Sequence, residues 1–305
     1  MGITKSEILL AELNTFFQHV NPKNIFSSIY AYYRTYENYK DVLLNIVRGK
    51  YPFEARLRTG QIVKIDNYVS AYFFTVYFTK LQNPDFSSDV LEFIFDSRKV
   101  SFYGWKYGGI IDAFGRHDYD FLNVENKTVV DIGAFIGDTA VYFALKGAKR
   151  VIAFEPFPKF FYLAQKNVKV NNVNDKVILI NAGCGYDGKV RVKEDSGSNA
   201  ASVLINQEEG IEIPTYSLDT ITSSFDVEDG SVLKIDCEGC EYELFKRATD
   251  NAFKKFNQIQ IEYHYGHKEL ENRLKRAGFK VRHSIPKIVQ VNDGQIVGYI
   301  YAWKL

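Results

Sequence analysis

The pattern of apolar and polar residues changes along this chain of 305 residues, and it predicts two kinds of structure. Before residue 88, apolar residues recur at helical spacing, which indicates amphipathic helices over about residues 8–20, 25–47 and 69–81. Two alternating segments between residues 91 and 103 then flank a polar turn, which is typical of a β-hairpin. We therefore expect an N-terminal helical region over 1–88, and a hairpin with a connector over 89–127.

From residue 128 onward, short apolar runs alternate with helical segments. The runs predict strands at 128–132, 151–154, 177–180, 232–235 and 259–261, with helices at 138–145, 158–170, 241–248 and 268–277. Such alternation is typical of a parallel sheet covered on both faces. Residues 189–216 predict an inserted hairpin, and Asn292-Asp293-Gly294 predicts a hairpin turn in the tail. The predicted fold class of residues 128–305 is therefore α/β: a doubly wound, mostly parallel seven-stranded sheet with an antiparallel C-terminal strand.

A glycine turn follows the first of these strands, where open α/β sheets bind their ligands. It reads Asp131-Ile132-Gly133-Ala134-Phe135-Ile136-Gly137-Asp138. With Gly133 as its middle glycine, the dinucleotide fingerprint Gly-x-Gly-x-x-Gly would also need glycines at 131 and 136. A carboxylate at 131 would repel a pyrophosphate, but it suits a ligand with a cationic amino group, such as the methionine part of S-adenosylmethionine.

A second carboxylate, Glu155, ends the second strand 22 residues beyond Gly133. At that place it can accept hydrogen bonds from ribose hydroxyls. Helix capping by Asp131 and a turn role for Glu155 are the alternatives, but the pair at this spacing favours a nucleoside site. Beyond the third strand, the small residues Ala182 and Gly183 suit a place beside an adenine ring, although any tight loop has a similar composition.

Several runs of sequence resemble the FkbM-type methyltransferases. They are Val129 to Thr139, Ala153-Phe154-Glu155-Pro156, and Leu233-Lys234-Ile235-Asp236-Cys237-Glu238-Gly239-Cys240-Glu241. Ser217 to Ile221 and Tyr119 to Leu122 also resemble the family. The resemblance covers about residues 100–282 and implies a class I, Rossmann-like enzyme. Such enzymes transfer a methyl group from S-adenosylmethionine, mostly to hydroxyl oxygens of sugars or natural products. Cys237 and Cys240 depart from the family pattern, in which Val and Ala are expected.

The resemblance carries cofactor roles to Asp131, Gly133, Gly137 and Glu155. The complete set of cofactor contacts that we expect is Asp131, Gly133, Ala134, Phe135, Gly137, Asp138, Thr139, Glu155, Pro156, Ala182, Gly183 and Asp236.

Acidic residues and a histidine follow the fourth and fifth strands. Asp236 and Glu238 are two residues apart and share a face of an extended strand, and Glu262 and His264 repeat this arrangement. Methyl transfer to an alcohol needs removal of the hydroxyl proton, so the candidate catalytic residues are Asp236, Glu238 and His264. Helix capping and a packed histidine are the structural alternatives. Asp236, Glu262 and His264 could also hold a divalent cation, but their spacing is no metal signature and we predict no metal site.

Composition and charge limit the classes of partner and the compartment that we expect. The formal net charge is +1, so the chain lacks the basic excess that is typical of nucleic-acid-binding proteins. We therefore expect a small-molecule or carbohydrate hydroxyl acceptor.

Three cysteines argue against a disulfide framework and for a reducing compartment, and Cys237 and Cys240 are interpreted as two small, buried or half-buried residues. Acidic residues interrupt the first apolar run, which argues against a signal peptide, and no apolar run is long enough to span a membrane. A cytoplasmic location is therefore expected.

Three other functions remain open at this point. An RNA or protein methyltransferase is the first, although no Asn-Pro-Pro-Tyr run follows the fourth strand. An NAD(P)-linked oxidoreductase is the second, and the missing glycines argue against it. A binding module with a degenerate site is the third, and the intact Asp131 and Glu155 argue against it.

Overall fold

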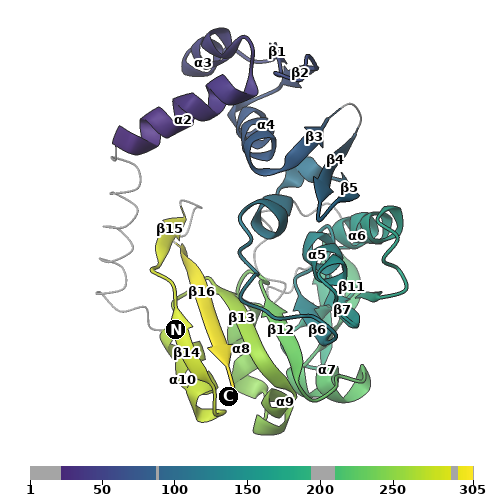
Figure 1. The fold of residues 1–305 in the computed structure, drawn as a ribbon. Helices are drawn as coiled ribbons and strands as arrows, with labels where there is room; N and C mark the ends of the chain where they lie inside the picture. Colours follow the sequence, from purple (N-terminus) through teal and green to yellow (C-terminus); the bar gives the residue numbers. More distant parts are fainter. Residues whose placement is uncertain (1–21, 87–88, 194–209, 290–294, 305) are drawn as a thin grey trace. The chain divides into compact units, whose positions relative to one another are not determined.

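The computed structural model describes residues 22–86, 89–193, 210–289 and 295–304 (Figure 1). The chain divides into two compact units, one over Phe17–Asp118 and one that contains Tyr119–Leu305. Each unit has its own core, and the predicted site residues all lie in the second. Among the described residues, no helix combines the length and the apolar character needed to cross a membrane.

The first unit mixes helices with short strands. Its elements are α2 (Pro22–Thr35), α3 (Tyr39–Val47), β1 (Phe53–Arg56), β2 (Ile62–Ile65), α4 (Tyr68–Lys80), β3 (Gln82–Asp85), β4 (Val90–Phe95), β5 (Arg98–Tyr103) and short 3-10 and π turns at Trp105–Tyr107 and Ile111–Gly115. The predicted helix near 69–81 and the β4–β5 hairpin are confirmed. The helix expected over 25–47 is instead two helices, and β1 and β2 were not predicted. The helix expected over 8–20 lies outside the described residues.

The second unit is built on one large sheet. Its strands are β6 (Thr128–Ile132), β7 (Arg150–Phe154), β8 (Val177–Ile180), β12 (Ser231–Ile235), β13 (Phe256–Tyr263), β14 (Lys280–His283) and β16 (Gln295–Trp303). They are ordered β14-β16-β13-β12-β6-β7-β8. Neighbours from β13 to β8 are parallel, and β16 runs antiparallel between β13 and β14. The predicted seven-stranded, mostly parallel class I fold is confirmed.

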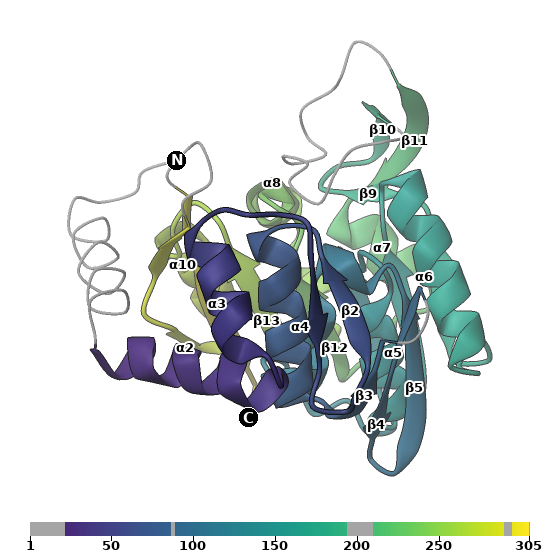
Figure 2. The same cartoon turned by 90° about the horizontal axis from the view of Figure 1, so that it is seen from above.

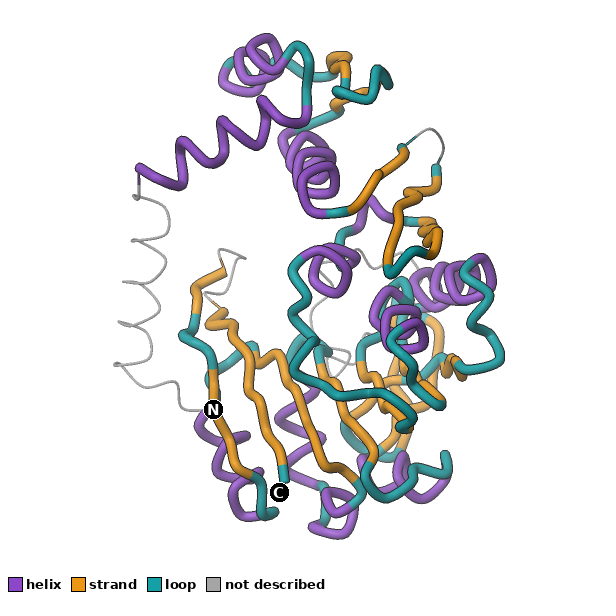
Figure 3. The backbone as a smooth tube through the Cα atoms, viewed as in Figure 1, coloured by secondary structure: helices purple, strands orange, loops and turns teal. Residues whose placement is uncertain are grey.

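Helices cover both faces of this sheet, as Figures 1 and 3 show. They are α5 (Asp138–Leu145), α6 (Pro158–Val170), α7 (Leu218–Ser224), α8 (Cys240–Arg247), α9 (Asp250–Lys254) and α10 (Lys268–Arg276). Val130 and Ile132 belong to the core that the sheet shares with α7 to α10, whereas Asp131 points to the opposite face and contacts α5. Alternation along β6 therefore decides which residues are available to the site.

Two smaller features match the expected insertions. β10 (Gly188–Val192) and β11 (Ile211–Tyr216) form the predicted antiparallel hairpin, and β9 (Gly183–Cys184) joins them (Figure 2). Phe157, at the start of α6, packs on this small sheet. In the tail, β15 (Lys287–Val289) pairs antiparallel with β16, and the turn predicted at 292–294 lies outside the described residues. The short helices α7 and α9 were not predicted.

Candidate active site

The glycine turn lies directly against the end of β12. Gly133 follows β6 with φ +79°, and a Cβ placed on it would lie 1.7 Å from the carbonyl oxygen of Asp236. Gly137 has φ +81° and precedes α5, and a Cβ there would lie 3.0 Å from the Cα of Ala164. Only glycine fits at position 133, because both the positive φ and the close backbone contact exclude a side chain. The turn and the residue Asp236 are thus neighbours through their backbones.

A buried ion pair stands beneath this turn. Lys234 Nζ lies 3.0 Å from Asp131 Oδ1, and the two side chains are 1% and 0% exposed. Lys234 also donates to the carbonyl of Gly133 at 2.6 Å, while the hydroxyl of Thr139 donates to Asp131 Oδ2 at 2.6 Å. Burial works against the charge of Lys234, but Asp131 and Asp236 nevertheless hold its pKa above the usual value. Asp131 therefore holds the lysine that fixes the turn.

The predicted contact of Asp131 with a methionine amino group stays a prediction. In this structure both of its carboxylate oxygens already face protein groups, Lys234 and Thr139. Lys234 itself was absent from the predicted site, although it lies inside the run that carried the family resemblance.

Glu155 closes the other side of the turn. Its carboxylate accepts hydrogen bonds from the backbone N–H groups of Phe135, at 2.8 Å, and Phe157, at 2.9 Å. Asn181 donates to the carbonyl oxygens of Glu155 and Pro156, which fixes the end of β7. Burial raises the pKa of Glu155 to about 8 in spite of the two N–H donors.

The remaining predicted cofactor residues lie around the same turn or beyond β8. Ala134 and Pro156 are buried, and Phe135 is half-buried with its ring 4.4 Å from that of Phe160. Asp138 begins α5, and burial raises its pKa to about 7. Ala182 is buried in the core and Gly183 lies in β9, so an adenine contact of these two residues stays a prediction.

Asp236, Glu238 and His264 come together at the ends of β12 and β13. His264 Nε2 lies 3.3 Å from Glu238 Oε2 and 3.9 Å from Asp236 Oδ1. Glu262, near the end of strand β13, is hydrogen-bonded to Asp236. The three residues that were predicted to act together are therefore neighbours.

Glu241 orients this histidine, and it was absent from the predicted site. Its Oε1 lies 3.1 Å from His264 Nδ1 and also accepts the backbone N–H of His264. Its Oε2 accepts the backbone N–H of Gly239 at 2.9 Å. The glutamate is fully buried, so it ties the turn after β12 to the end of β13. The sequence did place Glu241 at the start of a helix, three residues after Glu238, and this was the signal that could have identified it.

The charges in this cluster are unequal. Burial opposes the charge of His264, but Glu241, Glu238 and Asp236 raise its pKa to about 10. Burial also raises the pKa values of Glu238 and Glu262, and the surrounding carboxylates add to that increase. One protonated imidazole thus lies among several acidic groups.

The expectation for the cysteines was wrong. Cys237 and Cys240 form a disulfide, with their Cα atoms 5.5 Å apart, and Cys184 is free and buried. The turn between them has positive φ values at Glu238 (+55°) and Gly239 (+109°), which reverses the chain and brings the two side chains together. The number of cysteines and the expected compartment do not predict this local backbone geometry, so the disulfide was missed. The disulfide encloses Glu238 and directly follows Asp236.

The chain is similar to proteins that bear methyltransferase names. It is 29% identical over 190 residues to a Methanocaldococcus jannaschii protein named among the protein N5-glutamine methyltransferases, covering 61% of this chain and 86% of that protein. It is also 29% identical over 143 residues to the hexuronic acid methyltransferase AglP of Haloferax volcanii, covering 47% of this chain and 58% of AglP.

A solved structure of similar fold is M. jannaschii TYW2 in complex with AdoMet. Its TM-score is 0.38 at 17% identity, covering 72% of this chain and 88% of that one. Residues 131–281 of the present chain match the methyltransferase FkbM domain, which includes the glycine turn, Glu155 and the Asp236–His264 cluster. The chain therefore carries an FkbM methyltransferase domain and is a methyltransferase that uses S-adenosylmethionine.

Proposed function

We propose that the protein transfers the methyl group of S-adenosylmethionine to a hydroxyl oxygen of a small-molecule or carbohydrate acceptor. The single observation that carries this proposal is the backbone contact between Gly133 and Asp236. It joins the cofactor turn to a cluster of carboxylates and an imidazole at the neighbouring strand ends. A donor and a hydroxyl acceptor bound on the two sides would meet where groups able to accept a proton already lie.

The cofactor would be held by the residues expected from the sequence. These are Asp131, Gly133, Ala134, Phe135, Gly137, Asp138, Thr139, Glu155, Pro156, Ala182, Gly183 and Asp236. Asp138 and Glu155 are buried carboxyl groups whose pKa values are raised to about 7 and about 8, and a cationic ligand beside them would favour their charged forms. When bound, the cofactor supplies an electrophilic methyl group on a positively charged sulfur.

Asp236, Glu238 and His264 would handle the acceptor proton. Because the pKa of His264 is about 10, the imidazole is protonated near neutral pH and is poorly suited to accept a further proton. We therefore assign proton acceptance to Asp236, whose side chain is 28% exposed and reachable by an acceptor. His264, held by Glu241, would position Asp236 and Glu238 and balance their charge. As the acceptor oxygen gains the methyl group, its proton would pass to the Asp236 carboxylate.

A protein amide is the main rival acceptor, because the M. jannaschii relative is named for glutamine methylation. In this chain Asp236, Cys237 and Glu238 follow β12, where an Asn-Pro-Pro-Tyr run would be expected for methylation of an amino nitrogen. Carboxylates at this place favour a hydroxyl, whose proton must be removed during transfer. The name of the AglP relative, which concerns a hexuronic acid, supports a carbohydrate acceptor. RNA is disfavoured by the net charge of +1.

The test is transfer of an isotope-labelled methyl group to a panel of acceptors. The panel contains uronic acids, neutral glycosides, a glutamine-containing peptide and RNA, each incubated with the full chain and labelled S-adenosylmethionine. We expect label in a hydroxyl acceptor. We expect Asp236→Asn to lower its kcat at least about 100-fold, the usual scale for a lost general base. Label in the peptide or RNA, with none in any hydroxyl compound, would overturn the proposal.

A further inference from the structure

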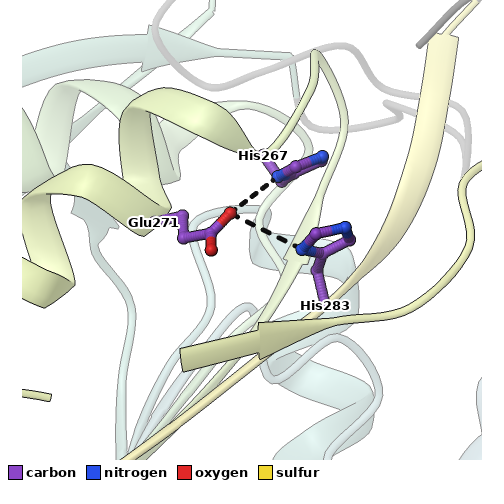
Figure 4. A group of neighbouring side chains, drawn as sticks. All are labelled: His267, Glu271 and His283. Atoms are coloured by element: carbon purple, nitrogen blue, oxygen red, sulfur yellow. Dashed lines mark hydrogen bonds and ion pairs between the residues drawn. The ribbon is translucent and has the colours of Figure 1, made fainter. Parts of the chain in front are cut away.

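A second cluster of titratable side chains lies outside the residues assigned above. It consists of His267, which precedes α10, Glu271, one helical turn later, and His283, the last residue of β14 (Figure 4). Both imidazole rings face the same carboxylate oxygen from two different elements. Their nitrogen and oxygen atoms all lie within 4.8 Å of one another.

The distances in this cluster suit metal ligands. Glu271 Oε2 lies 3.1 Å from His267 Nδ1 and 3.5 Å from His283 Nδ1. The second distance is longer than an ordinary N–H···O hydrogen bond, which spans about 2.7–3.2 Å. Two ligand atoms on one tetrahedral zinc ion lie about 3.3 Å apart, because each zinc bond is about 2.0–2.2 Å long. The two observed distances lie on either side of that value.

The fold holds these three side chains in place. His267 and Glu271 are four residues apart and so share one side of the first turns of α10. Leu270 and Leu274, on an adjacent side of α10, pack this helix into the core. On the other element, His283 pairs in register with Ile300 of β16. The ligands therefore stand on a helix and a strand that are each fixed by packing or pairing.

The second oxygen of Glu271 has its own partner. Lys275 Nζ lies 2.7 Å from Glu271 Oε1, which leaves Oε2 directed at the imidazoles. The rings of His267 and His283 are stacked, with centroids 3.8 Å apart, so a shared ion would require a modest rotation of His283. That side chain is 39% exposed and has room to rotate, and water can reach the site beside it.

We propose that His267, Glu271 and His283 bind one zinc ion, with water completing its coordination. Two imidazoles and one carboxylate are typical zinc ligands, whereas Mg²⁺ and Ca²⁺ prefer oxygen atoms alone. Such an ion links the start of α10 to the end of β14. The site was not predicted from the sequence, because its ligands are spread over 17 residues and fit no standard spacing.

The test is calorimetric titration of the metal-stripped full chain with zinc chloride, without reductant so that the Cys237–Cys240 disulfide offers no thiolate. We expect one ion per chain, with micromolar or tighter affinity and no comparable response to magnesium. His283→Ala removes an exposed ligand, and it should weaken binding at least about 100-fold, since lost outer contacts alone cost 10- to 100-fold. Glu271→Gln should act similarly, and zinc should raise the thermal unfolding midpoint of the unmodified chain but not of these variants.

Matched controls separate this site from the acceptor cluster, where Asp236, Glu238 and His264 also lie within 4.8 Å. Lys280→Ala changes an exposed residue of the same strand and should bind zinc normally. Glu238→Gln should also bind normally. Zinc binding that survives His283→Ala and is lost in Glu238→Gln would overturn the proposal, as would a folded chain that binds no zinc.

Discussion

The proposed donor side, formed by Asp131 and Lys234 at β6 and β12, and the proposed acceptor side, formed by Asp236, Glu238 and His264 after β12 and β13, lie on adjacent strands. Their charged groups differ in burial and pairing. On the donor side, Asp131 and Lys234 are completely buried, paired with each other and joined to the glycine turn. On the acceptor side, Asp236 and Glu238 are 28% and 49% exposed and share one histidine. A buried, paired charge gives fixed geometry, whereas partly exposed carboxylates can exchange protons. In the proposed mechanism the donor side would therefore be a rigid support, and the acceptor side would carry the proton chemistry.

The largest expected effect comes from Gly133→Ala. The added Cβ would lie 1.7 Å from the Asp236 carbonyl oxygen, so the turn and β12 must separate. We expect binding of S-adenosylhomocysteine to be lost, measured by calorimetry. Gly147→Ala is the matched control, because Gly147 also has a positive φ (+91°) but its nearest neighbour would be 3.6 Å away. Equal binding losses in both variants would show that backbone strain, and not the contact with Asp236, is responsible.

The next effect is expected from Lys234→Met. It leaves Asp131 as an unpaired buried carboxylate, and breaking a buried ion pair typically costs about 3–5 kcal/mol. Denaturant unfolding measures the loss, and adding Asp131→Asn to the same chain should restore part of it. Lys189→Met, which breaks the exposed pair with Glu212, should change stability little. A small effect of Lys234→Met would contradict the rigid role of the donor side.

The position of the glycine turn at the sheet edge was predictable from the sequence, but the side-chain pairs on both sides were predictable only in part. Short apolar runs that alternate with helices predicted the parallel sheet, although not the order of its strands. The Asp131–Asp138 turn lies at the ligand-binding edge because parallel strands place their carboxyl ends there. Glu241 and Lys234 escaped prediction because their roles depend on pairing across strands, with His264 and Asp131. The Cys237–Cys240 disulfide depends on two residues with positive φ, which composition does not reveal.

A smaller effect is expected from pH, and it should involve both sides. In the folded chain, burial raises the pKa values of Asp138 and Glu155 to about 7 and about 8. The folded chain therefore keeps these two protons at pH values at which the unfolded chain has already released them. Glu241, Glu238 and Asp236 raise the pKa of His264 to about 10, although burial alone would lower it. The protonated His264 stabilises the folded chain fully below about pH 6.5, and this stabilisation is lost as the pH rises through about 10. All three groups make stability fall with rising pH.

Thermal unfolding of the cofactor-free chain between about pH 5 and pH 10 measures this dependence. Glu155→Gln should flatten the curve below about pH 8, and His264→Asn should flatten it above about pH 7. Stability that rises over this range would contradict the assigned charges of both sides.

The smallest effect is expected from reduction of the Cys237–Cys240 disulfide. It closes a loop of only four residues, for which chain entropy gives about 2 kcal/mol of stabilisation. Because the loop encloses Glu238 on the acceptor side, reduction should raise the KM of the acceptor a few-fold, on the order of 1 kcal/mol. The affinity for S-adenosylhomocysteine should not change. A double variant, Cys237→Ser with Cys240→Ser, should be insensitive to reductant, and a change confined to cofactor affinity would contradict the division into two sides.

The most direct test of the central claim is calorimetry with S-adenosylhomocysteine on the unmodified chain and on Glu155→Gln. Glu155 is the buried carboxyl group that closes the turn, and the substitution preserves its size while replacing one acceptor oxygen by an NH₂ group that cannot accept a hydrogen bond. The account predicts one binding site per chain, with affinity about tenfold weaker in the variant, the scale of one hydrogen bond. A well-folded unmodified chain that does not bind the compound, or a variant that binds it equally well, would contradict the account.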